Sequence, residues 1–174
     1  GITTINNIQP ESIEKIKAKK AIDDTVTAKK NVIDQDNTTT QEEKEAAKAK
    51  VDEEATKAKA AIDHASTNSD VEQAKTTGET TISSIQPEVV KKAEAKQAID
   101  DAVTAKKAEI DQNQEATKEE KDAAKAKVDE EATKAKAAIS QASTNNDVDQ
   151  AKTSSVTTIS SIQPDIVKKA EAKK

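Results

Sequence analysis

Apolar residues recur at helical spacing in three successive stretches of the chain, at about 11–35, 41–65 and 70–84. Residues spaced three and four apart line one side of a helix, so this spacing predicts three amphipathic helices. The positions expected to face inward are Ile22, Val26, Lys29 and Ile33, then Ala47, Val51, Ala55, Ala58, Ile62 and Ala65, and then Val71, Ala74, Gly78, Ile82 and Ile85. Because Lys29 lies within the apolar stripe, we expect its methylene groups to cover the seam between helices.

Polar stretches with helix-capping residues separate the predicted helices. The segments 40–43 and 117–120 both have the pattern T-x-x-E, in which a threonine hydroxyl and a glutamate three residues later cap a helix reciprocally. Each segment is therefore expected to begin a second helix. Ser69 and Asn146 are the candidate caps for the third helix of each copy.

The three-helix pattern occurs twice. The stretch 46–62 recurs at 123–139 without a change, and 10–86 agrees with 87–163 at 55 of 77 positions. Self-similarity at a fixed period is the signature of tandem repeat proteins. The predicted domains are 1–9, the end (helix three) of a preceding repeat; 10–86, repeat one; 87–163, repeat two; and 164–174, the start (helix one) of a following repeat.

Short connections between helices favour an antiparallel three-helix bundle in each repeat. The predicted fold is all-α, with tandem three-helix bundles arranged end to end as an elongated, spectrin-like rod. Helix three of repeat one leads into the next repeat across Pro87, either as a near-continuous helix kinked at the proline or through a clean break with a new helix starting there. A helix of about 25 residues spans about 38 Å, so each repeat should lengthen the rod by roughly 40–55 Å.

The start of helix one carries a second apolar face. Ile13, Ile16 and Val90 lie off the inward stripe, and Val89 lies near its edge. A second apolar face predicts contact with the preceding repeat. The residues expected at the inter-repeat junction are Ile85, Pro87, Val89, Val90, Ile162 and Pro164.

The composition allows a folded but thin core. The chain has no Cys, Met, Phe, Trp or Tyr, and Ile, Val and Ala supply its apolar content. High charge without aromatic residues also occurs in disordered chains, but the helical periodicity favours a folded protein. A buried Ile or Val contributes about 1.5–3 kcal/mol, against an ordering cost of about 1–2 kcal/mol per residue. One repeat alone is therefore expected to be marginally stable, and packing against neighbouring repeats should help.

The charged residues favour a solvated surface. The chain has 33 acidic and 28 basic residues, well interspersed, with a net charge of −5. Such a surface keeps a protein soluble and does not attract nucleic acid. No apolar run approaches the length of about 18 residues that a membrane span needs, so no membrane insertion by this segment is expected. The absence of cysteine excludes disulfides and thiolate chemistry. The chain is also expected to be a monomer.

No catalytic, cofactor-binding or metal-binding residue is predicted, and the chain is not expected to be an enzyme. His64, the only histidine, corresponds to Gln141 in repeat two, so a catalytic role would leave repeat two without its histidine. A solvent-facing histidine is the simpler interpretation. The acidic clusters at 52–54 and 129–131 are consecutive on a helix and point in different directions, which predicts a solvated face.

The first loop of each repeat offers a weak calcium-binding pattern. Oxygen-bearing side chains within 34–45 and within 111–122 fall at EF-hand-like spacing. The turn glycine of that pattern is replaced by Thr39 and Ala116. Since the capping pattern explains the threonine and the glutamate without a metal, no metal site is predicted.

Four stretches of repeat two are AKKAEID (105–111), ATKEEKDAA (116–124), VDEEATKAKAAI (128–139) and TNNDVDQAK (144–152). They resemble the helical tandem repeats of Gram-positive, staphylococcal-type cell-wall-anchored surface proteins, the DUF1542-type repeat family. The likeness covers essentially the whole chain. The repeat family brings no catalytic residues, and none are assigned here.

The resemblance implies a non-catalytic stalk or spacer at the cell surface, anchored to the cell wall through the parent protein. Such a stalk would project an adhesive region in adhesion, aggregation or biofilm formation. The alternative is that the repeats themselves bind a host protein or associate with copies on a neighbouring cell. A binder should expose an apolar or aromatic hot spot, so the absence of aromatic residues favours the stalk. The expected partners are then the neighbouring repeats of the same chain.

Overall fold

Helices make up most of the computed structural model, which describes residues 10–173. They are α2 (Pro10–Asp34), α3 (Gln41–His64), α4 (Asn68–Ser83), α5 (Lys91–Asp111), α6 (Lys118–Gln141), α7 (Asn145–Ser160) and α8 (Lys168–Lys173). No strand occurs within 10–173. The predicted all-α class is confirmed, while the prediction that 1–9 ends a preceding helix falls outside the described residues.

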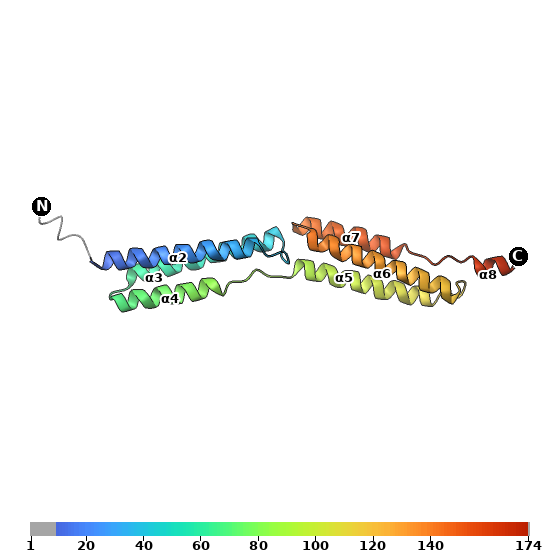
Figure 1. The fold of residues 1–174 in the computed structure, drawn as a ribbon, viewed down its shortest axis with the longest axis horizontal. Helices are drawn as coiled ribbons and strands as arrows, with labels where there is room; N and C mark the ends of the chain where they lie inside the picture. Colours follow the sequence, from blue (N-terminus) through green and yellow to red (C-terminus); the bar gives the residue numbers. More distant parts are fainter. Residues whose placement is uncertain (1–9, 174) are drawn as a thin grey trace, which may run out of the picture. The chain divides into compact units, whose positions relative to one another are not determined.

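The chain forms two units by its internal contacts. Among the described residues, unit 1 comprises 10–36 and 43–88, and unit 2 comprises 37–42 and 89–173. Unit 1 therefore holds α2, α4 and nearly all of α3, and unit 2 holds the four later helices (Figure 1). The short segment 37–42, between α2 and the second turn of α3, belongs to unit 2 by its contacts.

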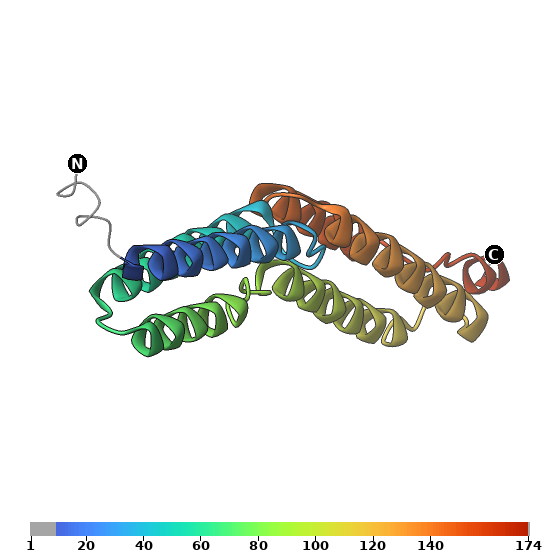
Figure 2. The same ribbon diagram turned by 60° about the vertical axis from the view of Figure 1, so that its left-hand side comes forward.

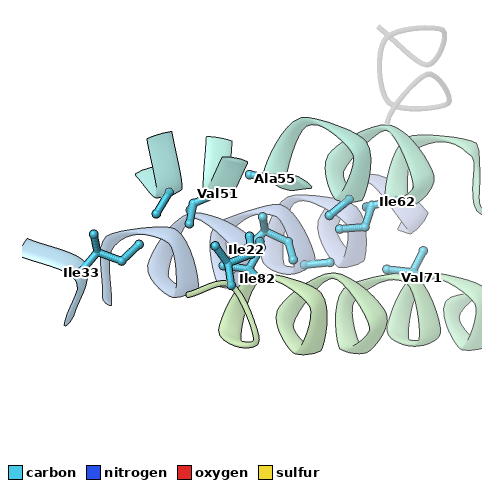
Figure 3. Close-up of a cluster of buried hydrophobic side chains, with 11 residues drawn as sticks. Ile22, Ile33, Val51, Ala55, Ile62, Val71 and Ile82 are labelled. Atoms are coloured by element: carbon cyan, nitrogen blue, oxygen red, sulfur yellow. The ribbon is translucent and has the colours of Figure 1, made fainter. Parts of the chain in front are cut away.

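Three helices surround a single core in unit 1 (Figures 2 and 3). Its fully buried side chains are Ile22 and Ile33 from α2, Val51 and Ile62 from α3, and Ile82 from α4. Ala47, Ala55 and Ala58 fill the remaining space on α3. Alanine lets helices approach closely but buries few methyl groups, so the isoleucines supply most of the apolar area.

Unit 2 repeats this core with α5, α6 and α7. Its buried residues are Ala95, Ile99, Ile110, Ala124, Val128, Ala132, Ala135, Ile139, Val148, Ile159 and Ile162. The unchanged stretches 46–62 and 123–139 bury the same five positions in the two units. The inward stripe predicted from helical spacing is thus confirmed for these helices.

The segment around Pro87 is not helical. α4 ends at Ser83 and α5 begins at Lys91, so the prediction of a near-continuous helix kinked at Pro87 is wrong. The alternative of a clean break holds, but the new helix begins four residues after the proline. Proline disfavours helical conformation in the residue before it, and Ser84 ends α4 by directing its hydroxyl back to the carbonyl of Thr81 at 2.8 Å. α7 ends and α8 begins in the same way around Pro164.

Threonine caps begin the third helix of each unit. The Thr67 hydroxyl accepts a hydrogen bond from the Asp70 N–H, and Thr144 does the same for Asp147, both at 3.0 Å. The prediction of Ser69 and Asn146 as caps is therefore wrong by two residues. Both threonines have the extended backbone that lets an N-cap side chain reach the third helical N–H.

Candidate functional site

Lysines form ion pairs with the acidic residues of the clusters at 52–54 and 129–131. Asp52 pairs with Lys30 of the neighbouring helix at 2.7 Å, whereas Glu53 and Glu54 pair with Lys57 on their own helix. Asp52 therefore points toward another helix, as predicted, whereas Glu53 and Glu54 share one lysine, so the prediction that the cluster does not converge is wrong for this pair. His64 is exposed in the last turn of α3. Within the residues that the structure describes, no group of three or more acidic or histidine side chains could hold a metal ion.

The calcium-like window of repeat two is built as a helix cap. The Thr117 hydroxyl accepts from the Glu120 N–H at 3.2 Å, and the Glu120 carboxylate accepts from the Thr117 N–H at 2.8 Å. This confirms the capping box predicted at 117–120. Lys125 donates to the Asp111 carboxylate at 2.7 Å, so an oxygen of the window already has a cationic partner.

Among the residues that the structure describes, three lysines are almost fully buried, namely Lys29, Lys92 and Lys106. A buried ammonium group is costly unless it is hydrogen-bonded. Lys29 donates to the carbonyl of Ser83 at 2.9 Å, which satisfies a carbonyl at the end of α4. Lys106 instead donates to the Glu109 carboxylate at 3.0 Å. The sequence predicted burial of the Lys29 stem but gave no sign of the carbonyl that receives its charge.

Lysines at the start of helix one bond to the end of helix two. Lys15 donates to the Asp63 carbonyl at 2.8 Å, and Lys92, 77 residues later, donates to the Ser140 carbonyl at 2.8 Å. Positive charge is favourable at a helix C-terminus, where carbonyls lack helical partners. This lysine position was not among the sequence-predicted site residues.

The six predicted junction residues differ in exposure. Ile85 and Ile162 lie in the cores of units 1 and 2, respectively. Pro87 and Pro164 are buried, whereas Val89 and Val90 are exposed. Ile13 and Ile16, assigned to the second apolar face, are also exposed. Their contact with a preceding repeat stays a prediction.

Stability should be level near neutral pH and fall in acid. Hydrogen bonds lower the pKa of four carboxyl groups, those of Asp63 (from Lys19), Glu109 (from Lys106), Glu120 (from the Thr117 backbone) and Asp122 (from Lys118). A carboxyl group with a lowered pKa stabilises the fold fully above its unfolded pKa of about 4, and this contribution is lost as pH falls through the folded pKa. We expect circular-dichroism melts to give a constant midpoint from about pH 5.5 to 9 and a lower midpoint below about pH 4.

Lysine side chains set the upper limit of the pH range in which the melting midpoint is constant. Carboxylate partners raise the pKa of Lys57, Lys75, Lys118 and Lys134, so their contribution persists until pH rises through the folded pKa. All these groups are well solvated, so 0.5 M salt should shrink the acid effect. A midpoint that is unchanged at pH 2.5 would contradict the prediction.

Both halves of the chain match the family described as Domain of Unknown Function (DUF1542), over residues 14–90 and 91–167. The chain belongs to this family. The matched segments follow each other directly and share the 77-residue period of the internal repeat. The resemblance stated from the sequence is therefore confirmed, and the chain carries two tandem DUF1542 repeats.

Two relatives from Staphylococcus aureus are similar to this chain. Extracellular matrix-binding protein EbhA of strain Mu3 / ATCC 700698 is 32% identical over 157 residues, which cover 90% of this chain. Extracellular matrix-binding protein ebh of strain USA300 / TCH1516 is 32% identical over 159 residues, or 91% of this chain. The matched region is 2% of the length of each relative. No solved structure matches the chain.

No helix within residues 10–173 combines the length and the apolar character needed to cross a bilayer.

Proposed function

We propose that this chain is a non-catalytic stalk segment of a bacterial cell-surface protein, with its repeats arranged end to end between a wall anchor and an adhesive region. Membership of a tandem repeat family whose relatives are named as extracellular matrix-binding proteins supports a surface location. The observation that carries the spacer role is the path of the chain through one unit.

The chain enters unit 1 at one end and leaves at the other. Lys15, at the start of α2, bonds to Asp63 at the end of α3, so these two helices are antiparallel. Lys29, near the end of α2, bonds to Ser83 at the end of α4, so α2 and α4 run in the same direction. A unit with opposite entry and exit adds length with every copy, which is what a spacer needs.

The described surface supports a spacer over a binding module. Ion pairs link neighbouring helices at equivalent places in both units, such as Lys30 with Asp52 and Lys107 with Asp129. Exposed ion pairs add little stability but keep a long surface polar. Large apolar side chains that are exposed lie mainly at the start of helix one and before it, while the sequence has no aromatic residue to form a hot spot.

The second candidate is that the repeats themselves bind a matrix protein or pair between cells. Its support is that the relatives are named extracellular matrix-binding proteins, although this chain matches only 2% of their length. Immobilised matrix proteins should retain the 174-residue chain if this candidate holds.

Small-angle X-ray scattering over a concentration series tests the spacer. A compact particle of this length has a radius of gyration near 16 Å, while two bundles placed end to end should give roughly 25–32 Å. We expect a concentration-independent value in the upper range. A compact value would reject the end-to-end arrangement, and a value that rises with concentration would favour self-association.

A further inference from the structure

We propose that the loop before helix two, together with the first turn of helix two, is the docking site for the start of the following repeat. The occupant is the segment that begins helix one of that repeat, which in unit 2 is residues 164–173. This docking site rests on the proposed stalk, because it requires that repeats follow one another along the chain. It adds to the stalk the residues that join one repeat to the next.

Glu120 uses both carboxylate oxygens at this site. Its Oε1 accepts from the Thr117 N–H at 2.8 Å and so closes the cap of α6. Its Oε2 accepts from the N–H groups of Val167 and Lys168 at 3.1 and 3.2 Å, where α8 begins. A carboxylate has lone pairs for all three bonds, and its charge is favourable beside the unpaired N–H groups of two helix starts.

A lysine forms the second part of the junction. Lys169 donates to the carbonyl of Gln114 at 2.7 Å, in the loop before α6. Lys92 stands 77 residues earlier and donates to the carbonyl of Asn37 at 3.0 Å, which stands 77 residues before Gln114. The bond from a helix-one lysine to a loop carbonyl thus occurs twice within unit 2. Lys92 bonds to the loop of repeat one, and Lys169 bonds to the loop of repeat two.

The receiving group in this bond is a backbone carbonyl. The loop differs between the repeats at 36–39 and 113–116, but every residue there offers a carbonyl. The lysine can therefore find the same acceptor whatever the loop side chains are. This accounts for a junction that persists across the most variable stretch of the repeat.

The first turn of helix two makes further bonds of this kind within unit 2. Gln41 donates its N–H to the Ser143 carbonyl at 2.7 Å, and the Glu42 carboxylate accepts from the Asn145 N–H at 2.9 Å. Asn145 is the first residue of α7. Within unit 2, the first turn of α3 thus bonds to the start of α7 and the turn before it, and the first turn of α6 bonds to the start of α8.

The docked segment also leaves a hollow beside α6. Pro164, Asp165 and Lys168 face Thr117 and Ala124 across a pocket of about 790 Å³. Exposed Ile166 and Val167 lie in the same segment. The polar bonds of Glu120 and Lys169 therefore hold the start of helix one, while apolar packing there is incomplete. At such a junction, hydrogen bonds determine the residue at which helix one begins, and apolar packing does not form a further hydrophobic core.

Amide hydrogen exchange measured by NMR on the 174-residue chain tests the docking. In the unaltered chain, the amides of Val167 and Lys168 should be protected. Glu120→Gln removes the negative charge and leaves one acceptor oxygen for three N–H groups. The amides of Val167 and Lys168 should therefore exchange at least about tenfold faster, as expected for loss of a charge-assisted hydrogen bond. The Val128 amide, within α6, should keep its protection and so report that unit 2 stays folded.

Glu119→Gln is the matched control, because it removes the same charge from the same turn at an exposed position. It should leave the amides of Val167 and Lys168 unchanged. Lys169→Met should speed exchange of the Glu171 amide, which bonds to the Val167 carbonyl in the first turn of α8, while Lys168→Met should not.

Two results would overturn the docking site. One is exchange of the Val167 and Lys168 amides at unprotected rates in the unaltered chain, and the other is an equal response to Glu119→Gln and Glu120→Gln. Scattering separates this inference from the stalk. An extended particle with unprotected amides rejects the docking site alone, whereas a compact particle rejects the stalk.

Discussion

Replacing Ile62 with alanine should lower the free energy of unfolding of unit 1 by about 2–5 kcal/mol. Ile62 is completely buried in the core (Figure 3). Its own helix supplies mostly alanine, whose short side chains cannot move into the space that the larger side chain leaves. Because a domain is stable by only about 5–15 kcal/mol, this one change should remove much of the stability of the unit. Urea denaturation with NMR reporters in each unit measures the effect.

Ile139→Ala is the matched substitution in unit 2. Ile139 ends the stretch that is unchanged between the repeats and is also completely buried, so its loss should be similar in size. Ile16→Ala is the exposed control, because Ile16 is 65% exposed and should change stability by no more than about 0.5 kcal/mol. An Ile62→Ala chain as stable as the Ile16→Ala chain would show that the core does not depend on its isoleucines.

The inward face of the helices could be predicted because helical periodicity is local information. Val51 and Ile62 face inward for the same reason as Val128 and Ile139, since an identical stretch of sequence has an identical apolar stripe. The cap at Thr117 was predictable too, because both partners of a capping box lie within four residues. Features set by a few neighbouring residues can be read from one sequence.

The partners of Lys29 and Lys92 could not be predicted, because they lie far along the chain. Lys29 bonds to a carbonyl 54 residues away and Lys92 to carbonyls 48 and 55 residues away. Every residue carries a carbonyl, so the acceptor has no signature in the sequence. The start of α8 was missed for a similar reason, since it lies where the Glu120 carboxylate receives two N–H groups and not at the proline.

One lysine position shows how a single substitution redirects a buried charge. Lys29 and Lys106 are equivalent, yet Lys29 bonds to the end of α4 and Lys106 bonds to Glu109. Position 109 is glutamate in repeat two, while the equivalent residue in repeat one is Val32. A carboxylate one turn away attracts the ammonium group more strongly than a neutral carbonyl does. Repeat one, without this acid, uses the carbonyl.

Gly78 marks a place where α3 and α4 approach more closely than any side chain allows. A Cβ built at Gly78 would lie 2.6 Å from the Ala58 Cβ and 2.9 Å from Ile22 Cδ1. Both distances are well below ordinary carbon contact distances of about 3.5–4.0 Å. The Ala58 Cβ is fixed to its helix and cannot rotate away. Close packing therefore accounts for this glycine, although glycine is a poor helix former.

Replacing Gly78 with valine should lower the free energy of unfolding of unit 1 by about 2–3 kcal/mol. The added methyl groups would have to push α3 from α4 or move Ile22, and either change would loosen a core with few large side chains. The small gain in helix propensity over glycine, at most about 0.5 kcal/mol, does not offset this cost. The same urea denaturation, with reporters in unit 1, measures the loss.

Ser155→Val is the control for that change, because Ser155 is the equivalent residue of α7, already carries a Cβ and is partly exposed. It should change the stability of unit 2 by less than about 1 kcal/mol. Gly78→Ala tests the clash more finely, since removing the opposing methyl with Ala58→Gly in the same chain should recover part of the loss that the alanine causes. If Gly78→Val and Ser155→Val had equal effects, close approach of α3 and α4 would not be the reason for the glycine.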